Sequence, residues 1–148
     1  MAWISLLAIE SHTGPRDPVQ VKPPINAAKF AIRCPWDADS RVDPGRHLSV
    51  RTYKLTVGTQ TASAPISRGN FDSTGAPELA PDDVPYPGTG GFPIDLVDWE
   101  SNNELEFRLL HTHDNGAQPM AAGLQVKWFN AAGVELTADG NVEPNPSE

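Results

Sequence analysis

The stretch NELEFRLLHTH, from Asn103 to His113, decides the fold class. Along it, Leu105, Phe107 and Leu109 alternate with charged neighbours. Successive side chains of a β-strand point to opposite faces of a sheet, so this pattern predicts a strand with one buried and one exposed face. The clearest element of the chain is therefore a half-buried strand.

Similar patterns lie on both sides of it. KFAIRC, residues 29–34, alternates Phe30, Ile32 and Cys34 with Lys29, Ala31 and Arg33. LQVKWF, residues 124–129, places Leu124, Val126 and Trp128 on one face, after which NAAG predicts a turn at Gly133 and VEL a return strand. These stretches predict further half-buried strands.

HLSVRTYKLTV, residues 47–57, is the longest run of β-forming residues, but its pattern changes phase. Leu48 and Val50 mark one face, whereas Tyr53 and Leu55 mark the other. A bulge near Thr52, or a strand that passes between two sheets, would explain the change.

Turn-forming residues occupy much of the remainder, since the chain has 15 prolines and 12 glycines. Residues 12–24, with four prolines, predict an extended arm. Residues 67–93 predict a long irregular loop. We expect an N-terminal strand and arm over 1–28, a β-sandwich over 29–136 and a tail over 137–148. The fold class is all-β, an antiparallel, jelly-roll-like sandwich with extended proline-rich terminal arms and a long central loop.

Charge and cysteine usage narrow the function classes. The net charge of −8 disfavours nucleic acid and anionic membranes as partners, and the basic residues form no run along the sequence. The single cysteine, Cys34, predicts a buried, inert thiol in a protein made in reducing cytoplasm. The apolar start of the chain lacks the features of a signal peptide, and no segment has the apolar length of a membrane span.

The stretch HTHDNG, residues 111–116, has two interpretations. His111 and His113 share one face of a strand, so they would suit a metal of the kind that cupin sandwiches bind. The cupin pattern also needs a glycine where Leu105 stands and a glutamate where Ala117 or Gln118 stands. Because Asp, Asn and Gly favour turns, we predict a strand end and no bound metal, with the metal site as the alternative.

Carboxylates suggest two further sites. Asp37, Asp39 and Asp43 invite a calcium interpretation, but Arg41 and Val42 break the helix-loop-helix calcium pattern, which leaves a solvated acidic loop or a looser calcium site. The second set is a candidate for hydrolysis by paired carboxylates: Asp95, Asp98, Glu100 and Glu104. We expect both sets to be solvated, and we expect no catalytic residue, cofactor or enzymatic activity.

Aromatic residues raise the question of sugar binding. Trp36, Trp99 and Tyr86 lie in predicted loops, where exposed rings stack against sugars in carbohydrate-binding modules. For Trp36 we favour packing against its own loop, and we expect Trp128 in the core. A carbohydrate-binding module is the first alternative to a structural role, and a cupin-like metalloenzyme is the second.

A small acidic sandwich with proline-rich ends, GPRDPVQVKPP before it and VEPNPSE after it, resembles the jelly-roll cement or decoration proteins of tailed-bacteriophage heads. The resemblance implies a virion protein, assembled in the host cytoplasm, that stabilises capsids by binding across subunit junctions. It also implies the major capsid protein or another virion protein as partner, and a homo-oligomer, dimer or trimer. Our interface candidates are apolar or aromatic: Trp3, Ile4, Leu6, Leu7, Val19, Val21, Phe71, Tyr86 and Phe92.

Overall fold

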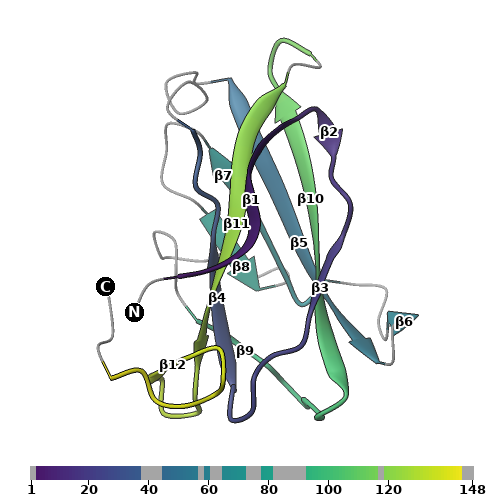
Figure 1. Cartoon of the computed structure of the whole chain (residues 1–148). Coiled ribbons are helices and arrows are strands. Elements are labelled where there is room, and N and C mark those ends of the chain that lie inside the picture. Colours follow the sequence, from purple (N-terminus) through teal and green to yellow (C-terminus); the bar gives the residue numbers. More distant parts are fainter. Residues whose placement is uncertain are drawn as a thin grey trace.

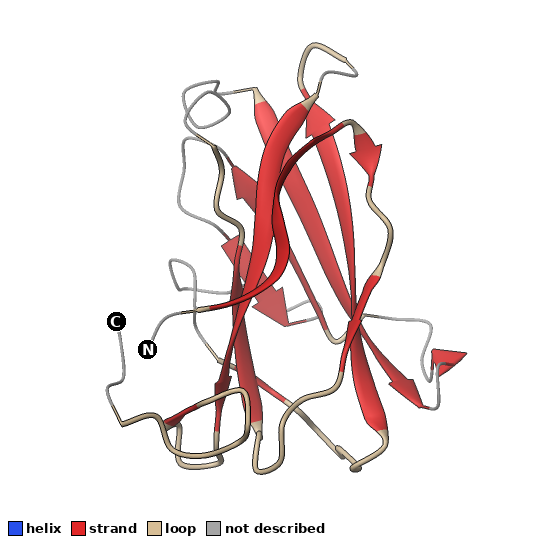
Figure 2. Ribbon diagram, in the orientation of Figure 1, coloured by secondary structure: helices blue, strands red, loops and turns tan. Residues whose placement is uncertain are grey.

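A computed structural model describes residues 3–37, 45–56, 59–60, 65–72, 78–81, 93–116 and 119–144. All the elements in these ranges are strands, and they form two antiparallel sheets that pack face to face (Figures 1 and 2). The predicted all-β antiparallel sandwich is thereby confirmed. The strands are β1 (Ile4–His12), β2 (Gly14–Pro15), β3 (Val19–Val21), β4 (Lys29–Arg33), β5 (Arg46–Thr56), β6 (Thr59–Gln60), β7 (Ser67–Asp72), β8 (Glu78–Pro81), β9 (Ile94–Asp95), β10 (Asn103–His113), β11 (Met120–Phe129) and β12 (Glu135–Leu136).

Within each sheet, strands from the start of the chain pair with strands from its end, and strands from the middle pair with one another; we call this pairing nested. Sheet A has the order β1-β11-β4-β9, with β12 also paired to β11. Sheet B has the order β2-β10-β5-β7-β8, with β3 also on β10 and β6 on β5. In sequence order, the nested pairs run from the outside of the chain to its middle: β1 with β11, β3 with β10, β4 with β9, and β5 with β7.

The core lies between the sheets and contains the alternating residues that the sequence predicted. Phe107 of sheet B meets Phe30 of sheet A edge to face, with ring centroids 6.0 Å apart, and Trp128 lies beside Phe30. Leu105, Phe107 and Leu109 are at most 2% exposed. Full burial of one such side chain contributes roughly 2–3 kcal/mol, so this two-sheet contact is the main stabilising feature.

The bulge predicted near Thr52 is wrong. Strand β5 pairs residue for residue with β10, from Arg46 opposite His113 to Thr56 opposite Asn103. Thr52 faces the core, while the next residue, Tyr53, is buried on the outer face under Arg108, whose Cζ lies 4.3 Å from the ring centroid. The hydrophobic pattern changes phase because the outer face is covered there, not because the backbone slips.

The segment predicted as an extended N-terminal arm is extended and lies along the edge of sheet B. Gly14–Pro15 and Val19–Val21 pair with the edge of β10. An edge strand tolerates proline because its missing N–H would face solvent, and Pro15 of β2 fits that position, while Pro18 lies between β2 and β3. The strands β1, β2 and β3 are thus paired within the two sheets.

Two further segments are more ordered than expected. Strands β7 and β8 form within the predicted central loop, where Gly69, Asn70 and Pro81 hide any alternating pattern. The predicted tail folds back as far as Glu143, whose N–H donates to the carbonyl of Glu135 at 2.9 Å. The predicted turn after β11 is confirmed, with Gly133 at φ +82°.

The outermost strands offer poor templates for another strand. β1 contains two register shifts, β9 has two residues, β8 ends at Pro81, and prolines interrupt the β2–β3 edge. Such edges disfavour the addition of a strand from another chain. Among the described residues there is no helix, and hence none of a length and apolarity that would cross a membrane.

Candidate functional site

The histidine pair of the HTHDNG stretch divides between core and turn. His111 points into the sandwich and is 2% exposed, whereas His113 begins the turn and accepts a hydrogen bond from the Asn115 N–H at its Nδ1, 3.0 Å away. Gly116, at φ +100°, donates its N–H to the His113 carbonyl at 3.1 Å. The predicted turn is confirmed.

His111 meets His12 of β1, with ring centroids 5.4 Å apart. Neither ring nitrogen of His111 has a hydrogen-bond partner. Burial above all, and then the charges of Arg16 and His12, lower the pKa of His111 to about 4, so this imidazole is neutral at physiological pH. Within the described ranges, no group of three or more His, Cys, Asp or Glu residues is placed to hold a metal ion.

The other sequence candidates are dispersed. Cys34 is buried, and burial raises the pKa of its thiol, as expected for an inert side chain. Of the three aspartates in the predicted calcium loop, Asp37 is described, whereas Asp39 and Asp43 lie outside the described residues. The paired-carboxylate candidates lie on and after β9 and at the start of β10, where three are exposed and Glu104 is half-buried: Asp95, Asp98, Glu100 and Glu104.

The tryptophans differ in exposure. Trp36 is 6% exposed, belongs to the core cluster and bridges to Ala122 of β11, so it is buried against the sandwich; its packing against its own loop stays a prediction. Trp128 lies in the core, as predicted. Trp99 is half-buried, with the Lys54 Nζ 5.7 Å from its ring centroid. It lines a cavity of about 480 Å³ together with Lys54, Ile66, Pro93, Ile94, Asp95 and Val97.

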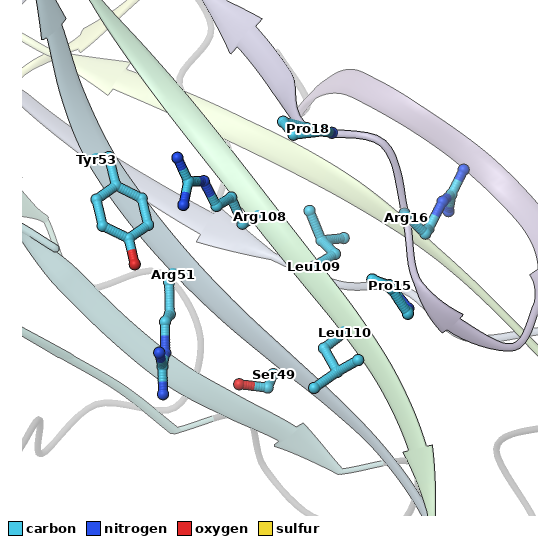
Figure 3. Close-up of a pocket in the computed structure, with 9 residues that line it drawn as sticks. All are labelled: Pro15, Arg16, Pro18, Ser49, Arg51, Tyr53, Arg108, Leu109 and Leu110. Atoms are coloured by element: carbon cyan, nitrogen blue, oxygen red, sulfur yellow. The ribbon is translucent and has the colours of Figure 1, made fainter. Parts of the chain in front are cut away.

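A larger hollow lies on the outer face of sheet B and its β2–β3 edge (Figure 3). Its volume is about 510 Å³, and we call it the arginine groove. Its lining combines arginines, apolar side chains and the hydroxyl groups of a serine and a tyrosine: Pro15, Arg16, Pro18, Ser49, Arg51, Tyr53, Arg108, Leu109 and Leu110. None of these described lining residues is acidic.

Strand register aligns three arginines beside this groove. Arg108 of β10 lies directly opposite Arg51 of β5, and Arg51 lies directly opposite Arg68 of β7. All three are exposed and belong to the outward-facing positions of their strands. We call Arg68, Arg51 and Arg108 the arginine row.

The central and outer members of the row are held differently. Arg108 stacks on Tyr53, and its Nε donates to Glu106 Oε1 at 2.6 Å. Burial raises the pKa of Glu106, but the hydrogen bonds from Gln20 and Arg108 and the Arg108 charge outweigh it and lower the pKa overall. Arg51 makes no hydrogen bond or ion pair with any described residue. The guanidinium of Arg108 is thus oriented, whereas that of Arg51 has no partner in the described part of the chain.

Arg16 holds in place the segment that carries Pro15 and Pro18, the two prolines that line the groove. Its backbone N–H donates to the Leu109 carbonyl, and its side chain points away from Arg51 and Arg108 (Figure 3) to donate to the Ala122 carbonyl, each at 2.9 Å. A longer contact of 3.4 Å joins it to Glu10. Arg16 therefore ties the edge of sheet B to sheet A rather than adding its charge to the groove.

The predicted interface residues are largely engaged with this chain. Ile4, Leu6, Leu7, Val19 and Val21 are partly buried against the core. Trp3 lies on the outer face of sheet A, where the Arg33 Cζ and the Lys127 Nζ are each 4.9 Å from its ring centroid. Phe71 is on β7, and Tyr86 and Phe92 lie outside the described residues. Their role in an interface stays a prediction.

Sequence reasoning missed the arginine row, because its members lie far apart along the chain. Each arginine occupies an outward position of a strand, but only the pairing register brings them together. The available signal was weak: Arg51 and Arg108 each interrupt an apolar strand pattern at an exposed position.

Comparisons with known proteins add no assignment, since no family, curated protein or solved structure matches this chain.

Proposed function

We propose that this protein is a non-enzymatic virion structural protein that binds across capsid-subunit junctions, as the cement or decoration proteins of phage heads do. The nested pairing of β1 with β11, β3 with β10, β4 with β9 and β5 with β7 carries the proposal. This order supports a jelly-roll interpretation, an architecture found in viral capsid proteins, lectins and cupins.

The described surface supports binding more than chemistry. The described residues that line the arginine groove are arginines, hydroxyl residues and apolar groups, and none of them is a carboxylate or histidine that would act as a general base. The cupin-like alternative receives little support, because the Nδ1 of His113 accepts a hydrogen bond within a turn and no third ligand is placed beside this pair among the described residues. Since the sheet edges disfavour strand addition, we propose that partners contact the outer faces.

The test is cosedimentation of the purified protein with tailed-phage heads that lack it, together with its mass in solution. We expect a dimer or trimer that pellets with the heads and raises their resistance to heat. A permanent monomer that remains in the supernatant would contradict the proposal.

A carbohydrate-binding module is the second candidate, and the cavity beside Trp99 favours it. Half-buried Trp99 offers a ring face, while Lys54 and Asp95 supply polar groups that would orient sugar hydroxyls. A glycan array tests this candidate, with Trp99→Ala as the variant that should lose any signal. A blank array, or a signal that survives Trp99→Ala, would remove it.

A further inference from the structure

We propose that the arginine row and the adjoining arginine groove bind an extended acidic peptide segment of a partner protein. The juxtaposition behind this proposal is Arg68, Arg51 and Arg108 side by side on three neighbouring strands, next to a groove walled by Pro15, Pro18 and Leu110. The proposal concerns the chemistry of the partner, and it holds whether or not that partner is a capsid protein.

Arg51 is the least favourably placed member of the row. Like charges directly opposite one another on adjacent strands destabilise a sheet, and Arg51 has such a neighbour on both sides. Arg108 is already paired with Glu106, so the charge that most needs an anion is that of Arg51. An anion that bridges adjacent guanidinium groups would remove the repulsion.

Carboxylates match the geometry of the row. Neighbouring strands lie about 4.8 Å apart, so adjacent arginines present their donors at a spacing that a carboxylate can bridge. Each guanidinium offers a planar pair of N–H donors that fits two carboxylate oxygens. Arg108 is already oriented by Tyr53 and Glu106, which reduces the entropy lost on binding.

The groove favours a peptide over a long polyanion. Leu110 is 42% exposed, and with the two prolines it forms an apolar wall that aliphatic side chains can cover. A volume of about 510 Å³ suits a few residues. A nucleic acid or sulfated polysaccharide would extend past the row over a protein of net charge −8, where repulsion opposes it. A short segment with two or three carboxylates avoids that repulsion.

The experiment uses a short fluorescein-labelled peptide in which glutamate alternates with leucine and proline, and a matched peptide with glutamine in place of glutamate. Fluorescence anisotropy with the full chain should show binding of the glutamate peptide alone, weakened by added salt. Arg51→Gln and Arg68→Gln should each weaken binding about tenfold, as expected for the loss of a charge-assisted hydrogen bond.

The control is Lys22→Gln, which changes the net charge equally at an exposed position outside the row and should bind as the parent does. Far-ultraviolet circular dichroism verifies that each variant is folded. The proposal is overturned if the glutamate peptide fails to bind, or if Arg51→Gln and Lys22→Gln bind it equally. It is also overturned if a heparin oligosaccharide or single-stranded DNA binds the row more tightly than the peptide. Cosedimentation with phage heads has no part in this readout, so the two proposals fail separately.

Discussion

A cationic residue on the outer face of sheet A and one on the outer face of sheet B differ in burial and in pairing. On sheet A, Lys127 is 6% exposed, lies against Trp3 and pairs with Glu135 at 2.7 Å. On sheet B, Arg51 is exposed, lies between two other arginines and has no partner among the described residues. The Lys127 charge is covered and neutralised by the chain itself, whereas the Arg51 charge is exposed and has no described counter-charge.

This difference shows that the chain can neutralise a cation on a sheet face where its fold requires it. The outer face of sheet A is packed to the point that Ala31, predicted to face solvent, is fully buried. Arg51 of sheet B is the contrast, because no described residue supplies it with a counter-charge. The acidic partner proposed above would supply that charge.

The largest effect is expected from breaking the ion pair on the covered face. Glu135→Gln should lower the free energy of unfolding by about 3 kcal/mol, because the buried Lys127 ammonium loses its counter-charge. Urea unfolding at neutral pH measures the change. The matched control is Asp95→Asn, which removes an exposed ion pair 3.9 Å long from Lys29 and should cost less than about 1 kcal/mol. Equal losses from both variants would show that sheet A is not covered as described.

The second-largest effect is a dependence of stability on pH that arises from His111. This side chain is buried in its neutral form, so it has no charge to be balanced at neutral pH. Its pKa lies near 4 in the folded protein, below the ordinary 6.5, so the unfolded chain binds a proton that the folded chain does not. Stability is therefore full above pH 6.5 and falls as the pH drops toward 4, by up to about 3 kcal/mol.

Urea unfolding across this pH range tests the expectation, with His111→Leu as the variant and His113→Gln as the control. His111→Leu should flatten the pH dependence between pH 6.5 and 4, whereas His113→Gln should keep the parent's slope. An unchanged slope in His111→Leu would assign the acid sensitivity to other groups.

The smallest effect has the opposite sign and concerns the open face. Arg51→Gln should raise the stability of the free protein by about 0.5 kcal/mol, because it relieves repulsion on both sides of the row. Lys22→Gln serves again as the control and should change stability less. Added salt should narrow the gap by screening. A lower stability for Arg51→Gln would mean that its aliphatic stem stabilises the sheet more than its charge destabilises it.

Local patterns predicted the strands of the core well. Alternation at Phe30 and Ile32, at Leu105 to Leu109 and at Leu124 to Trp128 predicted the inward faces, because one-sided burial leaves a period of two in the sequence. Turn chemistry likewise predicted the turns after β10 and β11, which contain Gly116 and Gly133. These features depend on neighbours in the chain.

Features that depend on long-range pairing were missed. β7 lacks a local strand pattern and forms because β5 supplies its hydrogen-bond partners. The arginine row and the meeting of His12 with His111 likewise need the register between strands that are distant in sequence. No local rule fixes that register, so the candidate site was not visible before the fold.

The nested pairing also limits which strands can pair while the chain is still being translated. Ile4 of β1 finds its neighbour, Val126, only after most of the chain has left the ribosome. At about 5–20 residues per second, the first strand waits several seconds with its apolar side chains uncovered. A nascent chain of this kind would gain from a chaperone that shields residues such as Leu6 and Leu7 until β11 emerges.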